Sequence, residues 1–358
     1  MNAMRLRAAI VGCGRMGVLT TERTRSLLPE AWFPLSHADA MSANNKYEIV
    51  AVCDVDEQKA ISTAAQLGLP PKAAYTDFDA MLLAEHPDVL SIATRTPGRV
   101  DLIERAVTAG VRGIHCEKPL SQHFHDGVEV LSRVESAGVH FSYGTLRRFM
   151  PAYRMAKALI DQGAIGEVRE VVVDLAWHDM LLWSHPHSID LLIYFTSETQ
   201  IASVNAVCEF GDTEVSRGLI DCDPKVDFAR VRFASGKLGL ITSSSGMNLR
   251  VSGSEGIVEV RANGASVEVF RKGAGATFDD REVIAVPSAP SGTYQAFDEL
   301  ADAVQSGAKL GISTAEIAAN QRIIWAVATS ALLDGKTVRA AEVDEDLVIT
   351  GRTGALTA

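Results

Sequence analysis

The sequence predicts an α/β domain with a parallel sheet, followed by an α+β domain with a large open sheet that is mostly antiparallel. Three observations lead to this fold class. In residues 1–146, short apolar runs alternate with helical patterns. A glycine-rich turn directly follows the first of these runs. Beyond residue 146, candidate strands follow one another with little helix between them.

The apolar runs of the first part have the length expected of buried strands. Their continuous rather than alternating pattern is typical of a sheet that is covered on both faces. The predicted strands are residues 7–11, 47–53, 88–94, 113–116 and 139–143. The predicted helices between them are residues 57–67, 77–85, 99–109 and 124–137.

The second part begins with a predicted helix at residues 152–162, and Pro186 opens another at 188–195. Asn263-Gly264 is a strong hairpin signal between two of the strands that follow. The predicted strands are residues 168–177, 201–210, 226–234, 237–245, 257–260, 267–270 and 282–286. Helices are predicted again at 294–305 and 314–333. We therefore expect one domain at residues 1–146 and a second at 147–358.

Length and charge limit the classes of function. The chain has 358 residues, which favours two domains. Its 34 Lys and Arg against 45 Asp and Glu give a net charge of −11, which opposes binding to nucleic acid or to an anionic membrane. No apolar run approaches the ~18 residues of a membrane span. Five cysteines without Cys-x-x-Cys spacing predict no disulfide framework and no structural zinc, and we expect a reducing cytoplasm.

The glycine-rich turn reads Gly12-Cys13-Gly14-Arg15-Met16-Gly17 and fits G-x-G-x-x-G after a strand. Glycines let the backbone approach a pyrophosphate, and the helix N-terminus that follows favours the anion. Asp54 ends the second strand, where a carboxylate accepts hydrogen bonds from both ribose hydroxyls and repels a 2′-phosphate. We therefore predict NAD as the cofactor and consider NADP a weaker alternative. A glycine turn that binds nothing is the structural alternative.

The spacing between this turn and the acid is unusual. Asp54 lies 37 residues after Gly17, whereas about 20 are expected. We interpret residues 18–36 as holding an insertion of roughly 17 residues before the helix body. It either caps the cofactor pocket or is an inert surface excursion.

Glu117-Lys118-Pro119 follows the fifth strand, and strand carboxyl ends in such sheets face the ligand crevice. A lysine beside a cationic nicotinamide has its charged form disfavoured, so Lys118 is a candidate proton acceptor and donor. A plain surface lysine is the alternative.

A third segment, His185-Pro186-His187-Ser188-Ile189-Asp190, marks a helix start. His187 and Asp190 are one turn apart and share a helix face. His187 is a candidate proton relay, with a packed core histidine as the alternative. No carboxylate or cysteine completes a convincing ligand set around the two histidines, so we predict no metal.

Taken together, these motifs resemble the Gfo/Idh/MocA family of NAD(P)-dependent oxidoreductases, the glucose–fructose oxidoreductase and inositol dehydrogenase group. The segments that carry the resemblance are GCGRMG at 12–17, VAVCDVD at 50–56, AGVRGIHCEKPLS at 109–121, YGTLRRFMPAY at 143–153, GAIGEVREV at 163–171, HSIDLL at 187–192, FASGKLG at 233–239 and VSGSEGIVEV at 251–260. The resemblance implies a Rossmann domain and a second domain for substrate binding and oligomerisation. It also implies a homo-oligomer, a dimer or tetramer.

By this resemblance Lys118 and His187 are the catalytic pair. It also matches His37 to a histidine that the family places three residues after the third glycine, which gives the same 17-residue insertion. The predicted cofactor contacts are Gly12, Gly14, Arg15, Met16, Asp54, Thr94, Glu117 and Lys118.

The sequence departs from the family at three places. Trp183 stands where the family often has aspartate, and His185 where it usually has glycine. Arg99 stands where the family often has histidine. Trp183 offers a stacking face for a sugar ring. Arginines suit a carboxylate or phosphate. The predicted substrate contacts are Trp183, Arg99, Arg148 and Asp190.

We thus expect an enzyme that transfers a hydride between nicotinamide and the carbinol of a sugar, cyclitol or sugar derivative. Four alternatives stay open. They are a dehydrogenase of a hydroxy-semialdehyde hemiacetal, an aldehyde or imine reductase, an NAD-dependent glycosidase, and a regulatory protein that binds the dinucleotide as a signal.

Overall fold

The computed structural model describes residues 4–175, 179–211, 215–216, 218–244, 246–273, 275 and 277–351. The chain divides into two compact units. Unit 1 comprises Met1–Ser121, Asp126–Phe149 and Ala289–Thr314, and unit 2 comprises Gln122–His125, Met150–Ser288 and Ala315–Ala358. The expected domain boundary at residue 146 stays a prediction. The sequence did not predict that residues 289–314 belong to unit 1.

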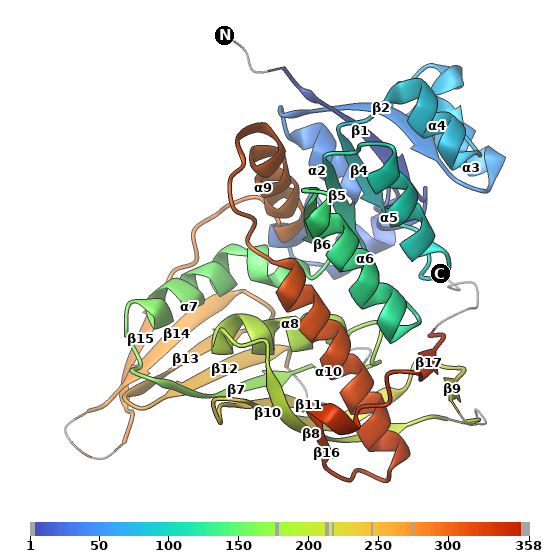
Figure 1. Ribbon diagram of the computed structural model, residues 1–358. Helices are drawn as coiled ribbons and strands as arrows, with labels where there is room; N and C mark the ends of the chain where they lie inside the picture. The colour runs from blue at the N-terminus through green and yellow to red at the C-terminus, as the bar shows by residue number, and fades with distance from the viewer. Residues whose placement is uncertain are drawn as a thin grey trace. The chain divides into compact units, whose positions relative to one another are not determined.

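Unit 1 is built on a parallel sheet (Figure 1). Among the described residues it has six strands in the order β3-β2-β1-β4-β5-β6. The strands are β1 (Leu6–Val11), β2 (Tyr47–Cys53), β3 (Ala74–Tyr75), β4 (Val89–Ile92), β5 (Gly113–Cys116) and β6 (His140–Tyr143). The predicted parallel sheet is confirmed, and the two-residue β3 is the strand that the sequence did not predict.

Side-chain caps and glycine turns set the helix ends of unit 1. Asp56 and Asp77 accept hydrogen bonds at the starts of α3 and α4. Gly98 begins α5 with φ +76°, a backbone conformation that favours glycine. The helices are α1 (Glu22–Leu27), α2 (His37–Ala43), α3 (Glu57–Gln66), α4 (Phe78–Glu85), α5 (Arg99–Thr108), α6 (Phe124–Ser136) and α9 (Gly292–Ser306). Short 3₁₀ turns lie at η1 (Glu30–Trp32), η2 (Pro71–Ala73) and η3 (Leu146–Phe149).

Helix α9 comes from late in the chain yet belongs to the core of unit 1. It packs on α2, β5, β6 and η3. Phe297, Leu300, Ala301 and Val304 are buried in one cluster with β1 and α2 residues. Gly113 of β5 permits this approach, because a Cβ there would lie 2.6 Å from a Val304 methyl carbon. The core of the parallel sheet is therefore completed by α9.

The predicted insertion is confirmed by backbone hydrogen bonds. The Val18 amide donates to the Gly14 carbonyl, as in the first turn of a helix. The amides of His37 and Ala38 then donate to the carbonyls of Met16 and Gly17, which makes the helical pattern continuous if 17 residues are removed. The chain leaves the helix after its first turn, forms α1 and η1, and returns at Ser36, which caps α2.

Unit 2 is α+β, as predicted. Its large sheet is mixed but mostly antiparallel, and among the described residues it has nine strands in the order β15-β14-β13-β12-β7-β11-β10-β8-β16. The strands are β7 (Val168–Asp174), β8 (Ile201–Glu209), β10 (Lys225–Phe233), β11 (Leu238–Thr242), β12 (Asn248–Gly253), β13 (Gly256–Arg261), β14 (Ser266–Arg271), β15 (Asp280–Ile284) and β16 (Val338–Arg339). A small parallel pair joins β9 (Leu219–Ile220) to β17 (Val348–Ile349).

The helices of unit 2 are α7 (Pro151–Asp161), α8 (His185–Thr196) and α10 (Thr314–Leu332), with a 3₁₀ turn η4 (Ala340–Glu342). Helix α8 packs on β7 and β11, where a Cβ at Gly239 would come 2.7 Å from Leu192. The hairpin at Asn263-Gly264 is confirmed between β13 and β14. The predicted ends of two strands, Trp177 and Ser245, lie outside the described residues.

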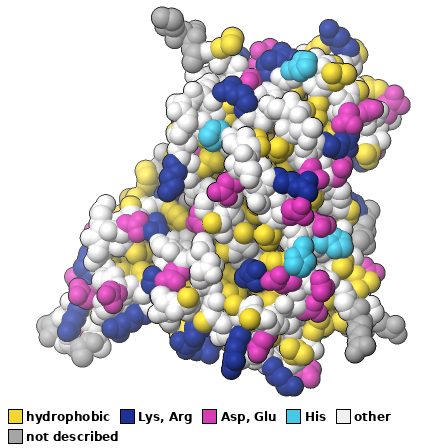
Figure 2. Space-filling view, viewed as in Figure 1, with side chains coloured by type: hydrophobic (Ala, Val, Ile, Leu, Met, Phe, Trp, Pro, Cys, Tyr) yellow, Lys and Arg dark blue, Asp and Glu magenta, His cyan; other side chains and the backbone are white. Residues whose placement is uncertain are grey.

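Charged side chains of both signs are interspersed on the face of the molecule seen in Figure 2. Among the described residues, none of the helices has the length and apolar character needed to cross a membrane.

Candidate functional site

The candidate site of unit 1 lies at the carboxyl ends of its parallel strands. The strand order reverses direction between β1 and β4, and ligands of such sheets bind in the crevice at this point. The loops that leave β1, β2, β4 and β5 carry the glycine turn, Asp54, Thr94 and Lys118. The parallel topology therefore brings these predicted residues to one edge of one sheet.

The three glycines of the turn serve different needs. Gly12 has φ +94°, and a Cβ there would lie 2.7 Å from the Ala93 carbonyl carbon. A Cβ on Gly17 would lie 1.9 Å from the Gly12 oxygen. Gly14 differs, because a Cβ there would meet nothing within 4 Å. The packing of the chain thus requires Gly12 and Gly17, whereas Gly14 leaves open space beside the turn. Arg15 and Met16 are the two other turn residues predicted to contact the cofactor. Arg15 is exposed and Met16 is half-buried. The Met16 carbonyl accepts a hydrogen bond from the His37 amide.

Asp54 is fixed by two backbone amides. Its Oδ2 accepts a hydrogen bond from the Cys13 amide at 2.8 Å, and its Oδ1 accepts from the Asp56 amide at 3.0 Å. The carboxylate is thereby held against the glycine turn. The nearby Lys59 pairs with Asp56 at 3.1 Å. The position and charge of Asp54 suit a diol better than a 2′-phosphate.

The loop after β4 places Thr94 at the same edge. The Oγ1 atom of Thr94 is buried and has no hydrogen-bond partner among the described residues. A buried hydroxyl without a partner is rare in folded proteins, and a bound ligand is one way of satisfying it.

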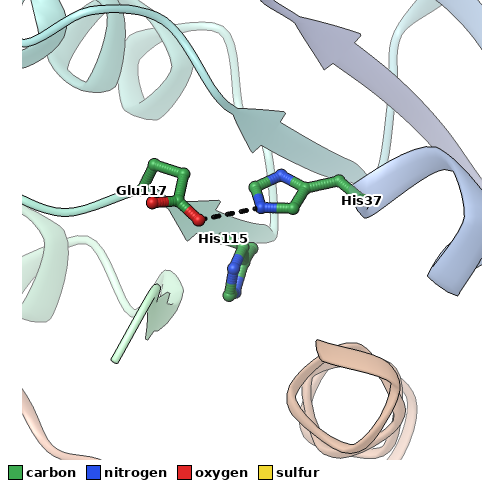
Figure 3. A group of neighbouring side chains, drawn as sticks. All are labelled: His37, His115 and Glu117. Carbon is green, nitrogen blue, oxygen red and sulfur yellow. Dashed lines mark hydrogen bonds and ion pairs between the residues drawn. The ribbon is translucent and has the colours of Figure 1, made fainter. Parts of the chain in front are cut away.

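Glu117 lies directly after β5 and is buried, and Figure 3 shows the His37 imidazole directed at its carboxylate. The distance from His37 Nε2 to Glu117 Oε1 is 3.3 Å, and His37 Nδ1 lies 2.7 Å from Ser91 Oγ. The Lys118 amide donates to Glu117 Oε2 at 3.2 Å. Burial alone would raise the pKa of Glu117, but the His37 hydrogen bond and nearby positive charge lower it to about 2. The residue before Lys118 is thus a buried carboxylate fixed from two sides.

His115, two residues earlier on β5, completes a group of three potential metal ligands whose atoms lie within 4.8 Å of one another. Its Nδ1 lies 2.9 Å from Ser142 Oγ, and its ring extends away from the Glu117 carboxylate in Figure 3. Burial lowers the pKa of His115 to about 3, so this ring is neutral at neutral pH. The ring packs on Phe297 instead, with centroids 4.6 Å apart. The expectation that the protein binds no metal stays a prediction.

The buried carboxylate predicts a pH dependence of stability. The pKa of Glu117 is lower in the folded chain than its ordinary value of 4.5, so the unfolded state binds more protons. Stability from this group is present above about pH 5 and is lost as the pH falls toward 2. In the wild type, protonation of Glu117 lowers the free energy of unfolding between about pH 5 and pH 2. We expect this loss to be on the order of 3 kcal/mol and to be absent in Glu117→Gln. Denaturant unfolding between pH 2 and 8 measures it.

Glu57 provides the matched control, because it is an exposed glutamate in the first turn of α3. Glu57→Gln should lose stability at acid pH as the wild type does. The same loss of stability in Glu117→Gln would contradict the assignment of the low pKa to Glu117.

Two predicted substrate contacts turn inward in unit 1. Arg99 is buried, and its guanidinium donates to the backbone carbonyls of Thr94, Glu117 and Pro119. Arg148 is also buried, and its Nη1 donates to the Gly311 carbonyl at 2.8 Å. Substrate contact by either residue stays a prediction, because both already serve the backbone of unit 1.

The insertion reaches the segment after β6. The Trp32 ring lies under the Arg147 guanidinium at 5.3 Å, and Pro34 accepts a hydrogen bond from Ser291 at the start of α9. The insertion is therefore attached to unit 1 at both places.

Unit 2 carries the other predicted residues on and before α8. The helix begins at His185, and His187 and Asp190 lie one turn apart on it. His187 and Trp183 are half-buried, whereas His185 and Asp190 are buried. His187 lies in the first turn of α8.

Sequence reasoning missed Asp223. Its carboxylate accepts from the Leu182 amide at 2.7 Å and from the Trp183 amide at 3.0 Å. It therefore fixes the backbone of the predicted substrate residue Trp183. A single aspartate after a short strand carries no signal that would have identified it.

Comparison with known proteins places these features in context. Residues 6–145 match the model of the GFO_IDH_MocA family, described as an oxidoreductase family with an NAD-binding Rossmann fold. The chain is 31% identical over 162 residues to a D-apiose dehydrogenase of Paraburkholderia graminis, covering 45% of this chain and 38% of the relative. It is 31% identical over 170 residues to an inositol 2-dehydrogenase of Rhizobium meliloti, covering 48% of this chain and 45% of the relative. The matches thus span less than half the length of these relatives.

Solved structures show the same fold over more of the chain. An inositol dehydrogenase homolog from Azotobacter vinelandii, complexed with NADH and myo-inositol, aligns with a TM-score of 0.74 at 16% identity, covering 94% of this chain and 98% of that one. A levoglucosan dehydrogenase in complex with NADH and L-sorbose aligns with a TM-score of 0.74 at 19% identity, covering 94% and 99%. The sequence match of residues 6–145 bears out the resemblance of this part of the chain to the NAD-binding Rossmann fold of the Gfo/Idh/MocA oxidoreductases, and the solved structures share the fold of both units.

Proposed function

We propose that the protein is an NAD-dependent oxidoreductase that transfers a hydride between nicotinamide and the carbinol carbon of a sugar, cyclitol or sugar derivative. The observation that carries this proposal is the edge of the parallel sheet. There a carboxylate fixed against a glycine turn and a lysine after β5 lie on loops of the same sheet.

The residues of unit 1 fit a dinucleotide. The open space beside Gly14 suits the pyrophosphate, and the Asp54 carboxylate suits the ribose hydroxyls. The Thr94 hydroxyl is a buried polar group without a partner among the described residues. NAD is favoured over NADP because Asp54 opposes a 2′-phosphate and Lys59 is paired with Asp56. Arg15, Met16 and Glu117 remain proposed contacts.

Two residues are proposed to handle the proton of the reaction. When bound, nicotinamide supplies the carbon that accepts or gives the hydride. Lys118 would hydrogen-bond the reacting oxygen and hold or release its proton at Nζ. His187, in the first turn of α8, would pass the proton on. Trp183 is proposed as a stacking surface for the substrate and Asp190 as a polar contact.

The class of substrate is proposed from the names of relatives. They include the D-apiose and inositol dehydrogenases above and a trans-1,2-dihydrobenzene-1,2-diol dehydrogenase of Bos taurus, 29% identical over 133 residues that cover 37% of this chain and 38% of the relative. Each of these names describes an enzyme acting on a compound with hydroxyl groups on adjacent carbons. A vicinal diol, in a sugar or a ring, is therefore the proposed substrate feature.

The test is absorbance of NADH during incubation of the purified protein with a substrate panel. The panel holds sugars, cyclitols, sugar acids, hydroxy-semialdehydes and glycosides, each with NAD and with NADP. NADH formation from a polyol supports the proposal. NADH formation from semialdehyde hemiacetals alone would replace the proposed sugar or cyclitol substrate by a hydroxy-semialdehyde hemiacetal. Tight NAD binding without any redox change would overturn the proposal in favour of a regulatory protein, or of a glycosidase if a glycoside is consumed.

A reducing compartment, the cytoplasm, is proposed because all five cysteines are free thiols. A homo-oligomer, dimer or tetramer, is proposed from the family resemblance. Light scattering of the purified protein measures the oligomeric state.

A further inference from the structure

Arg99 is a buried arginine at the carboxyl edge of the sheet, and only 2% of its surface is exposed. It is the first residue of α5, and its helix starts from the left-handed Gly98. No carboxylate pairs with its guanidinium among the described residues. A buried guanidinium is costly unless its hydrogen bonds are made, so its acceptors are informative.

The acceptors of Arg99 are main-chain carbonyls from two neighbouring strand ends. Nη1 donates to Glu117 at 2.6 Å and also to Pro119, while Nη2 donates to Thr94. Thr94 follows β4, and Glu117 and Pro119 follow β5. The planar fork of a guanidinium holds several acceptors in fixed directions, which a lysine ammonium does not.

The two carbonyls bound by Nη1 flank a single residue, Lys118. The amide of that same residue donates to the Glu117 carboxylate, which His37 holds from the other side. The main chain of Lys118 is thus fixed before, at and after the residue. Its side chain is the one that the proposed function requires at a defined place.

We propose that Arg99 is a positioning residue for Lys118, which ties the loops after β4 and β5 together by binding their carbonyls, and is not itself a contact for substrate. The inference rests on the proposed function in one respect, the role of Lys118. A positioning role differs from a purely structural one because the loss of turnover in an Arg99 variant should depend on the presence of Lys118.

The test compares Arg99→Met, Arg99→Lys, Lys118→Met and the double variant Arg99→Met/Lys118→Met. A displacement of about 1 Å in a reacting group costs on the order of 10²-fold in rate, so Arg99→Met should lower kcat by about that factor. The Kd for NAD should stay within a few-fold. Arg99→Lys should recover only part of the rate, because it keeps the charge but not the fork.

The double variant is the decisive measurement. If Arg99 acts through Lys118, adding Arg99→Met to Lys118→Met should leave the residual rate unchanged. An equal further loss in the double variant would overturn the proposal, as would a wild-type rate in Arg99→Met. A rise in KM with unchanged kcat would instead restore Arg99 as a substrate contact.

Hydrogen exchange supplies a readout that needs no turnover. The amides of residues 116–122 should exchange at least ten-fold faster in Arg99→Met than in the wild type. The control is Arg105→Met on the same helix, because Arg105 is only partly buried and pairs with Asp79 and Asp101. Faster exchange together with a wild-type rate in Lys118→Met would keep the loop contact but refute the role of Lys118 in the proposed reaction. Unchanged exchange would refute the contact itself.

Discussion

Replacing Lys118 by methionine is expected to lower kcat by ~10²–10⁴-fold, the range that a positioned proton donor or acceptor contributes. Methionine keeps the length and apolar character of the side chain but cannot carry a proton. The Kd for NAD is expected to stay within a few-fold, because Asp54 and the glycine turn are untouched. Steady-state turnover on the substrate found by the panel and calorimetry of NAD binding measure the two quantities.

Lys72→Met is the matched control, since Lys72 is an exposed lysine on η2 of the same unit. It should leave kcat and the Kd for NAD unchanged. Near-normal turnover of Lys118→Met would remove Lys118 from the chemical step. A parallel loss of NAD binding would assign it to the cofactor instead.

Asp54→Ala is expected to weaken NAD binding by roughly 10- to 100-fold, which corresponds to the loss of hydrogen bonds to a charged group. Affinity for NADP should fall less or rise, because the charge that repels a 2′-phosphate is removed. Part of the loss comes through the glycine turn, since Asp54 Oδ2 also holds the Cys13 amide. The ratio of Kd values for NAD and NADP separates the two causes, because loosening of the turn affects both dinucleotides alike.

The neighbouring Asp56→Asn tests whether local charge alone is responsible. Asparagine is a good helix cap, so α3 keeps its start while one negative charge is lost. This variant should keep most of the discrimination between NAD and NADP. Equal discrimination in the wild type and Asp54→Ala would show that Asp54 does not read the ribose.

Features with local causes could be predicted from the sequence. Buried parallel strands are continuous apolar runs, and the predicted range 47–53 agrees with β2 at both ends. The hairpin at Asn263-Gly264 also has a local cause, because Asn and Gly readily adopt the positive φ that such a turn needs, and both residues do so in the structure. The insertion was predicted from the spacing between Gly17 and Asp54 and from the position of His37.

Features that depend on contacts between distant parts of the chain could not be predicted from the sequence. The two-residue strand β3 has no periodic pattern of its own and forms because β2 lies beside it. Strand β12 was missed although its residues alternate between the two faces of the sheet.

The direction of a long side chain is equally hidden. Arg99 and Arg148 stay predicted substrate contacts, but the sequence did not predict their hydrogen bonds to main-chain carbonyls of unit 1. Backbone acceptors leave no mark in a sequence, so an inward arginine cannot be told from an outward one.

Helix α9 has a consequence for the order in which the protein is made. Residues 1–146 leave the ribosome well before Phe297 and Leu300, which complete the core around β1 and α2. Until then the nascent sheet exposes the apolar face that α9 later covers. We expect a fragment of residues 1–146 to aggregate on expression, and a fragment joined to residues 289–314 by a flexible linker to stay monomeric and bind NAD. Residues 1–146 therefore cannot complete their core until α9 has been synthesised. Chaperone dependence should be greatest during that interval of synthesis.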